Sequence, residues 1–292
     1  MEPVFNEDGS YNLDTWYANP VALMRENEAE ERSLRVLGNT AATLTLLEGF
    51  SLRGSAGVDQ YTLRSRLYDS PVVGLQQGVG GGTAASSAST KLNAELTLNF
   101  DRDLSAANRI SGVVGTGYET NNDDFTSASG SGFPGEQFRY LTSAAVVSGG
   151  SNSVTEWSLV SFFGRLTYNL SDQLITTFNI RTDGSSRFGE NNRYGTFPSV
   201  STLWQVGDMP FMQNQSLFSN LALRASYGRT GNQQGIGNFA SLGLFGAVAY
   251  NDRPGLAPTQ LANPDLKWET TDQLNVGTDF ALLDERLSLS LD

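Results

Sequence analysis

Apolar and polar side chains alternate along much of this chain. In residues 91–100, every even-numbered position is Leu, Ala or Phe, and every odd-numbered position is Lys, Asn, Glu or Thr. Because successive side chains of a strand point to opposite faces, this period of two predicts a strand with one apolar and one polar face. The alternation recurs, in places more weakly, at 34–47, 50–64, 108–120, 158–170, 174–183, 197–206, 221–228, 268–282 and 286–292. The pattern predicts about ten strands, most near the roughly 9–11 residues that a tilted strand needs to cross a bilayer.

The segments between the predicted strands are alternately short and long. The tight connections are Glu48-Gly49, Ser171-Asp172 and Asp284-Glu285, and the long ones are 65–90, 121–156 and 230–265. Outer-membrane β-barrels have short turns at one rim and long loops at the other. A soluble sandwich also alternates, but it has no reason to collect its long loops at one end. We therefore expect an antiparallel meander, with one helical turn near residues 209–213.

The parity of the alternation predicts which side chains face inward. Charged residues of one parity are too numerous for a soluble core; they are Arg53, Asp59, Glu95, Arg165, Arg181, Arg224 and Asp279. A polar lumen could accept them, whereas the aromatic residues of the other parity suit contact with lipid. In one strand, we expect Phe178 and Ile180 to point outward, and Asn179 and Arg181 to point inward.

Composition narrows the range of functions. The chain has 292 residues, a net charge of −12, no cysteine and no histidine. The acidic balance argues against nucleic-acid binding, and the missing residue types remove thiolate metal sites, most zinc sites and Ser-His-Asp triads. The chain has no run of about 18 apolar residues, so no transmembrane helix is predicted. Residues 1–8 lack the features of a signal peptide, so we expect that the signal was removed or that the chain begins inside a longer gene product.

Several segments resemble one family when they are taken in order. They are 161–169 (SFFGRLTYN), 181–189 (RTDGSSRFG), 192–199 (NRYGTFPS), 223–233 (LRASYGRTGNQ) and 263–271 (NPDLKWETT), and residues 19–23 and 130–134 also fit. Each motif alone is weak, but together, over about residues 19–292, they are similar to SusC/RagA-type TonB-dependent receptors.

The resemblance implies an all-β fold that is part of a transmembrane barrel. Receptors of this type have about 22 strands around a plug domain. The chain is then expected to be an internal fragment: an open, curved antiparallel sheet of about ten meander strands, without the plug, the signal peptide and the C-terminal strands. On this basis we expect residues 1–33 to form an extracellular loop segment and residues 34–292 to form the partial barrel.

The resemblance also implies a function in the outer membrane of a Gram-negative cell. Such a receptor imports oligosaccharides, or in some members peptides, and breaks no bond, so neither an enzyme activity nor a cofactor is expected. The implied partners are the TonB-ExbB-ExbD system, acting through the missing N-terminal part, and a SusD-like surface lipoprotein. Two alternatives stay open: a soluble β-rich carbohydrate-binding or adhesin module, and a siderophore or cobalamin receptor.

A few residues are candidates for contact with a ligand. Aromatic rings that could stack on sugars are Trp16, Tyr17, Tyr61, Tyr68 and Tyr250. Arg187, in the segment 183–189, could also contact ligand, although a structural role in a hairpin end is favoured for that segment. Residues 121–124 (NNDD) could hold a hard cation, but a solvated loop tip is the simpler interpretation. Residues 231–238 lack the lysine and helix of a phosphate loop. We predict no catalytic residue and no metal site.

Overall fold

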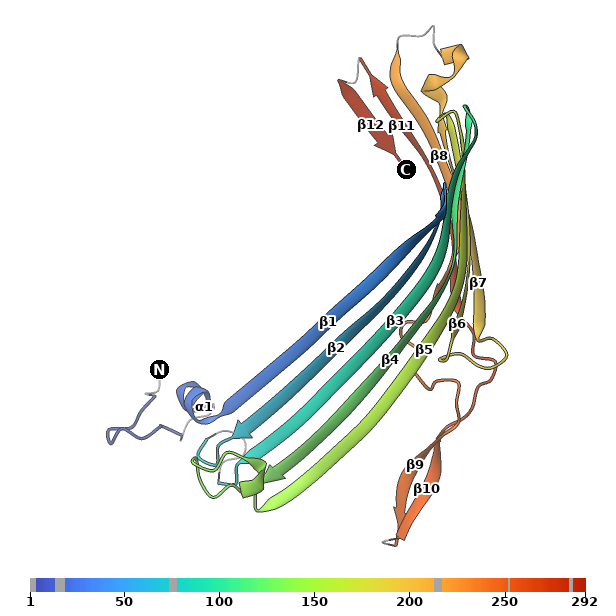
Figure 1. Cartoon of the computed structure of the whole chain (residues 1–292). Helices are drawn as coiled ribbons and strands as arrows, with labels where there is room; N and C mark the ends of the chain where they lie inside the picture. The colour runs from blue at the N-terminus through green and yellow to red at the C-terminus, as the bar shows by residue number, and fades with distance from the viewer. Residues whose placement is uncertain (1–3, 14–18, 74–77, 213–216, 252, 284–285) are drawn as a thin grey trace. The chain divides into compact units, whose positions relative to one another are not determined.

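The computed structural model describes residues 4–13, 19–73, 78–212, 217–251, 253–283 and 286–292. Within these residues, ten strands form one antiparallel sheet, in which they are ordered as they occur along the chain (Figure 1). They are β1 (Glu28–Leu47), β2 (Phe50–Asp69), β3 (Gly81–Ser105), β4 (Asn108–Ser131), β5 (Val146–Leu170), β6 (Leu174–Ser185), β7 (Tyr194–Gln205), β8 (Phe218–Asn232), β11 (Glu269–Leu282) and β12 (Leu287–Leu291). The predicted ten-stranded meander is confirmed, and the strand order does not close on itself.

The remaining elements are short. β9 (Leu244–Tyr250) and β10 (Arg253–Gln260) form a separate hairpin within the segment that we expected to be a loop. The chain also has a helix, α1 (Pro20–Glu26), and the 3-10 turns η2 (Leu141–Ser143), η3 (Val206–Asp208) and η4 (Pro210–Met212). The expected helical turn near residues 209–213 corresponds to the 3-10 turn η4, and residue 213 lies outside the described residues. In the described part of the chain, no helix is long and apolar enough to cross a membrane.

The first five strands are longer than we predicted. β1 and β2 have 20 residues each, and β3, β4 and β5 have 24 or 25. The predicted loops 65–90 and 121–156 were wrong in extent, because the connections cover only 70–80 and 132–145. Small residues such as those of Gly81–Ser89 show no alternation, but they can adopt an extended backbone wherever neighbouring strands supply hydrogen-bond partners.

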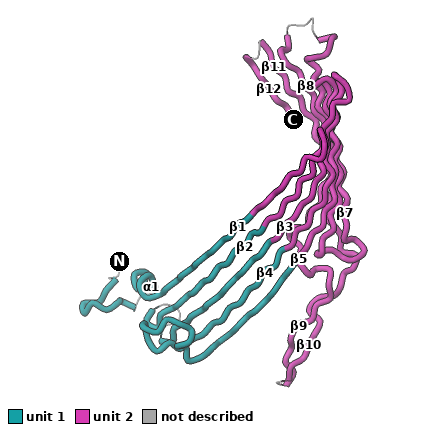
Figure 2. The backbone as a smooth tube through the Cα atoms, viewed as in Figure 1, with its two compact units in different colours: residues 1–38, 58–91, 121–156 teal, residues 39–57, 92–120, 157–292 magenta. Residues whose placement is uncertain are grey.

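The chain divides into two compact units (Figure 2). Unit 1 comprises Met1–Gly38, Val58–Lys91 and Asn121–Glu156, and unit 2 comprises Asn39–Gly57, Leu92–Thr120 and Trp157–Asp292. β1 to β5 each run through both units, whereas β6 to β12 belong to unit 2 alone.

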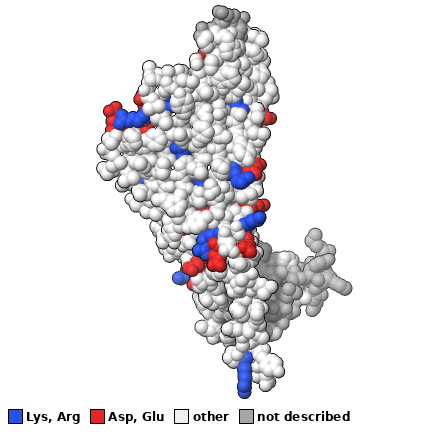
Figure 3. All heavy atoms as spheres, turned by 90° about the vertical axis from the view of Figure 1, so that its right-hand side faces the viewer, with Lys and Arg blue, Asp and Glu red and all other residues white. Residues whose placement is uncertain are grey.

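The strand register of unit 2 separates apolar rows from polar rows. One row of cross-strand neighbours is apolar from β5 to β11: Leu166, Phe178, Val200, Tyr227 and Leu274. The adjacent row is polar or glycine: Arg165, Asn179, Ser199, Gly228 and Gln273. Because adjacent residues of a strand face opposite ways, these rows lie on opposite faces of the sheet. The face shown in Figure 3 carries few charged side chains, gathered in small clusters.

The turn between β5 and β6 is one residue longer than the two-residue turn that the sequence predicts, because Leu170 pairs with Leu174. Ser171 and Asp172 both have positive φ, of 51° and 57°, as the two central residues of a type I′ hairpin turn do. The Asp172 amide donates to the Asn169 side-chain oxygen at 2.9 Å, and the Asn169 amide group donates to the Asp172 carboxylate at 2.6 Å. These local bonds offset the strain of positive φ and fix the register of the two strands.

In unit 1, hydrogen bonds join segments that lie outside the strands. Asn19 caps α1 by accepting from the amides of Val21 and Ala22, and its own amide group donates to the Val4 carbonyl at 2.7 Å. The Phe133 amide donates to the Val79 carbonyl at 3.0 Å. Two connections of the chain are therefore bonded directly to one another.

Candidate functional site

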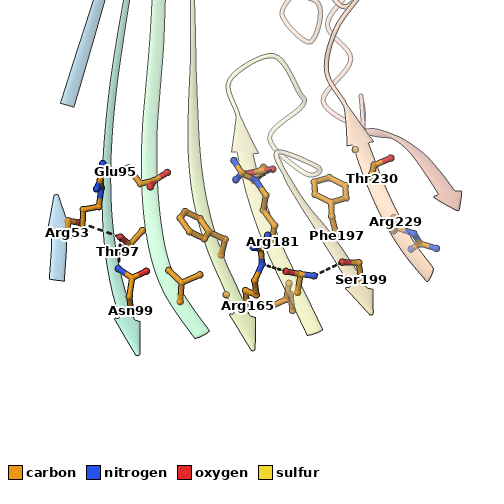
Figure 4. Close-up of a pocket in the computed structure, with 17 residues that line it drawn as sticks. Arg53, Glu95, Thr97, Asn99, Arg165, Arg181, Phe197, Ser199, Arg229 and Thr230 are labelled. Carbon is orange, nitrogen blue, oxygen red and sulfur yellow. Dashed lines mark hydrogen bonds and ion pairs between the residues drawn. The ribbon is translucent and has the colours of Figure 1, made fainter. Parts of the chain in front are cut away.

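Unit 2 contains a cavity of about 820 Å³ on its polar face (Figure 4). Strands β2 to β8 contribute to it, and among its lining residues are Arg53, Glu95, Thr97, Asn99, Phe163, Arg165, Asn179, Arg181, Asp183, Phe197, Ser199, Arg229 and Thr230. Four arginines and several hydroxyl and amide groups thus face one space, and its volume is within the usual range for a ligand pocket.

A chain of hydrogen bonds crosses three strands at this cavity. Arg165 on β5 donates from Nε to the Asn179 side-chain oxygen at 2.8 Å, and Asn179 on β6 donates to Ser199 Oγ on β7 at 3.1 Å (Figure 4). Pairing of Arg165 with Asn179, and of Asn179 with Ser199, in the strand register brings the three side chains together. The amide neutralises no charge, so the guanidinium keeps its positive charge and its remaining donors for other groups.

A second arginine is held by a buried carboxylate. Arg181 donates from Nε to both oxygens of Asp183 at 2.8 Å and from Nη2 to Ser161 Oγ at 2.8 Å. Its guanidinium carbon lies 5.7 Å from the centre of the Phe163 ring. Asp183 is only 8% exposed, so the pair fixes the direction of the guanidinium. The arrangement can bind polar groups of a ligand through fixed donors.

Within the described residues, no three His, Cys, Asp or Glu side chains gather in a way that could hold a metal ion. Residues 121–124, one cation candidate, lie inside β4 rather than at a loop tip. There the Asn121 amide group donates to the Asp123 carboxylate at 2.7 Å.

Four of the six predicted ligand residues can be placed, namely Tyr61, Tyr68, Arg187 and Tyr250; Trp16 and Tyr17 lie outside the described residues. Tyr68 is 1% exposed, in unit 1. Its ring packs edge-on against Phe133 with ring centres 5.2 Å apart, and the Arg139 guanidinium carbon lies 5.4 Å from its ring centre. Tyr68 thereby joins the end of β2 to the connection 132–145.

Arg187 joins three parts of unit 2. Its guanidinium carbon lies 4.9 Å from the centre of the Trp157 ring. It also donates to the Asn238 side-chain oxygen and to the Gln233 carbonyl, both at 3.0 Å. These contacts attach the connection after β6 to the one after β8. Tyr250, at the end of β9, is 84% exposed and presents nearly its whole ring.

The motifs 183–189 and 263–271 meet in a packed cluster. Phe188 and Trp268 have ring centres 4.4 Å apart, and Trp268 also packs against Phe197 at 5.4 Å. The Gly189 amide donates to the Leu266 carbonyl at 3.0 Å. A methyl group on Gly189 would lie 1.9 Å from the carbonyl oxygen of Pro264, so only glycine fits without movement. This supports the structural interpretation of residues 183–189.

Sequence reasoning did not identify the bonds among Arg165, Asn179 and Ser199. The alternation had placed Arg165 and Asn179 on the inner parity, but it gives no register between strands. A two-residue turn at Ser171 and Asp172 would set Arg165 opposite Phe178, whereas the observed register, with Leu170 opposite Leu174, sets Arg165 opposite Asn179.

The whole chain is similar to proteins of known type. The profile of the family described as "TonB dependent receptor-like, beta-barrel" matches residues 3–292. TonB-dependent receptor P3 of Formosa agariphila is 31% identical over 99% of this chain and 30% of its own length. TonB-dependent receptor SusC of Bacteroides thetaiotaomicron is 40% identical over 47% of this chain and 14% of its own length.

A solved structure is similar in fold and, more distantly, in sequence. The structure of the RagAB peptide transporter aligns with a TM-score of 0.86 and 26% identity, covering 98% of this chain and 33% of the matched chain. The present chain therefore spans about a third of the length of the protein with which it aligns.

Proposed function

The chain belongs to the β-barrel family of TonB-dependent receptors, and from this premise we propose that it is part of the wall of an outer-membrane importer of oligosaccharides or peptides. Energy comes from the TonB-ExbB-ExbD system, and a SusD-like lipoprotein assists at the cell surface. In this proposal residues 1–33 are an extracellular segment, and residues 34–292 are the partial barrel. The protein binds its ligand and passes it on without breaking a bond.

The separation of rows in unit 2 is the observation that supports the proposal most. The apolar row through Phe178 has large exposed side chains, with Phe178 itself 52% exposed. Water-exposed side chains of this kind are unfavourable in a soluble sheet but suit the lipid-facing side of a barrel. The polar row through Asn179 contributes to the cavity, as a water-filled or ligand-filled interior requires.

The relatives favour nutrient uptake but leave the ligand class open. One structural relative is the RagAB peptide transporter, and another relative is the receptor SusC. The proposal therefore includes both oligosaccharide and peptide as ligand classes.

The full-length gene product, expressed in the outer membrane of a Gram-negative host with its lipoprotein, tests the proposal. We expect gel migration to change after boiling and solubility to depend on detergent. We also expect uptake of labelled oligosaccharide or peptide, and an uncoupler should abolish this uptake. A detergent-free soluble protein with unchanged migration would indicate a carbohydrate-binding or adhesin module. Uptake restricted to a siderophore or cobalamin would replace the proposed cargo.

A further inference from the structure

Unit 1 has a recess of its own, formed by side chains of four consecutive strands. Its volume is about 350 Å³. It is lined by Arg35 of β1, Asp59 and Tyr61 of β2, Ser89 and Lys91 of β3, and Asn121 of β4. The volume is at the lower end of the range for ligand pockets, so the recess suits a small unit of a larger ligand.

A charged pair forms one part of the recess. Arg35 donates from Nε to Asp59 Oδ1 at 2.9 Å and from Nη2 to Asp59 Oδ2 at 2.6 Å. This two-point geometry fixes both planar groups. A guanidinium has five N–H donors and a carboxylate has about four acceptor positions, so each group keeps sites for a ligand. The side chains are 58% and 29% exposed, and these sites are accessible.

A neutral pair provides further polar groups. Ser89 Oγ donates to the Asn121 side-chain oxygen at 3.2 Å, and the Asn121 amide group donates to Asp123 Oδ2 at 2.7 Å. The amide is thus oriented before any ligand arrives, and its orientation determines which polar groups of a ligand it can meet.

An aromatic ring completes the recess. Tyr61 follows Asp59 by two residues on β2, so both side chains lie on the same face of that strand. The Tyr61 side chain is 37% exposed and lines the recess. A tyrosine ring offers an apolar face for packing and a hydroxyl for hydrogen bonding.

From this arrangement we propose that the recess binds one sugar ring of a neutral oligosaccharide. Tyr61 packs against the C–H face of the ring, and the Arg35–Asp59 pair and Asn121 hydrogen-bond to its hydroxyl groups. This rests on the proposed import function and selects oligosaccharide over peptide. An aromatic face beside hydrogen-bonding groups that are already oriented matches the C–H face and the hydroxyl groups of a sugar ring.

Four forms of the full-length receptor in detergent test the proposal: wild type, Tyr61→Ala, Tyr61→Phe and Tyr118→Ala. Tyr118 is the matched control, because it is an exposed tyrosine of β4 of the opposite parity from Asn121. The probes are an array of neutral gluco-, manno-, galacto- and xylo-oligosaccharides and a pool of random octapeptides. Binding is measured as dissociation constants.

We expect at least one array sugar to bind, and Tyr61→Ala to weaken that binding about tenfold through loss of ring packing. Tyr61→Phe keeps the ring, and Tyr118→Ala lies elsewhere, so each should stay within about twofold of wild type. Sugar binding that Tyr61→Ala leaves unchanged overturns the proposal, as does binding of octapeptides with no array sugar, or no binding of either probe. Energy-dependent uptake, assayed separately, decides whether the import function itself fails.

Discussion

The connection between β8 and β11 contains two stretches with opposite properties. Residues 263–268 pack back onto the connection after β6, where Trp268 is 9% exposed. The β9–β10 hairpin, in the same connection, has Phe245 at 66% and Leu256 at 76% exposure. Both stretches contain large apolar residues, so the presence of such residues alone does not distinguish them.

The register of the hairpin accounts for its exposure. Residues opposite one another share a face, and one face consists of Phe245, Ala247, Ala249, Pro254, Leu256 and Pro258. In the described part of the chain these six side chains are exposed, and a two-stranded hairpin has no second layer to cover them. By contrast, the Trp268 indole donates to the Arg193 carbonyl at 3.1 Å. The comparison indicates that the segments resembling the family pack against other connections and stabilise the sheet. The side chains on this face of the hairpin have no such packing to maintain.

Removal of the buried indole should have the largest effect. We expect Trp268→Ala to lower the free energy of unfolding of the full-length protein by about 3–5 kcal/mol, since it removes a ring packed between two others. Chemical unfolding in detergent, followed by heat-modifiable migration, measures the loss. A loss below about 1 kcal/mol would mean that the cluster does not hold the connections together.

Adding one methyl group at Gly189 tests the close approach between the connection after β6 and the segment that precedes β11. We expect Gly189→Ala to cost about 1–3 kcal/mol, because the new methyl group would overlap the backbone of Pro264. Gly237→Ala is the matched control, since nothing lies within 4 Å of its added carbon. Equal stability of the two variants contradicts the tight packing at Gly189.

A pair of identical truncations compares the two stretches directly. Leu266 packs against the Phe188 cluster, so Leu266→Ala should cost roughly 1–3 kcal/mol. Leu256→Ala in the hairpin should change the free energy of unfolding by less than about 0.5 kcal/mol. The same unfolding assay measures both, and a larger loss at Leu256 would show that something covers the hairpin.

The smallest expected effect is a pH dependence of the free energy of unfolding, which arises in the connection 132–145 of unit 1. Burial, and secondly the nearby Glu26 carboxylate, raise the pKa of Glu136 above its ordinary value of 4.5. The ionised form is therefore disfavoured in the folded state, and stability declines as the pH rises from 4.5 through the folded pKa. Glu136→Gln should flatten this decline in a pH series of unfolding experiments. An unchanged slope would rule out Glu136 as its source.

The sequence predicted one end of the strands better than the other. Glu48-Gly49 and Ser171-Asp172 mark tight turns, and β1, β2, β5 and β6 end or begin beside them. At the long connections, glycine, serine and alanine continue the strands without alternation, so β3 starts at Gly81, ten residues before the predicted start. These strand ends depend on pairing with neighbouring strands, which a period along a single strand does not record.

At the candidate site, too, a pattern along one strand does not show which residues of other segments lie nearby. Parity placed Arg165, Asn179 and Arg181 on one side, as their shared cavity bears out. It could not reveal that Arg187 lies over Trp157, or that Tyr68 is buried beneath Arg139, because those contacts join segments far apart in the chain. Only the register and the packing of connections bring such residues together.

The central claim is that one face of the sheet meets lipid and the other does not, and two adjacent residues test it most directly. In full-length protein folded into lipid vesicles, Phe178→Arg should cost about 2–4 kcal/mol if the site is near the bilayer midplane. Asn179→Arg should cost much less, because its side chain faces the polar cavity. Equal costs, or a larger cost at Asn179, would contradict the assignment of the faces and the membrane-spanning barrel with it.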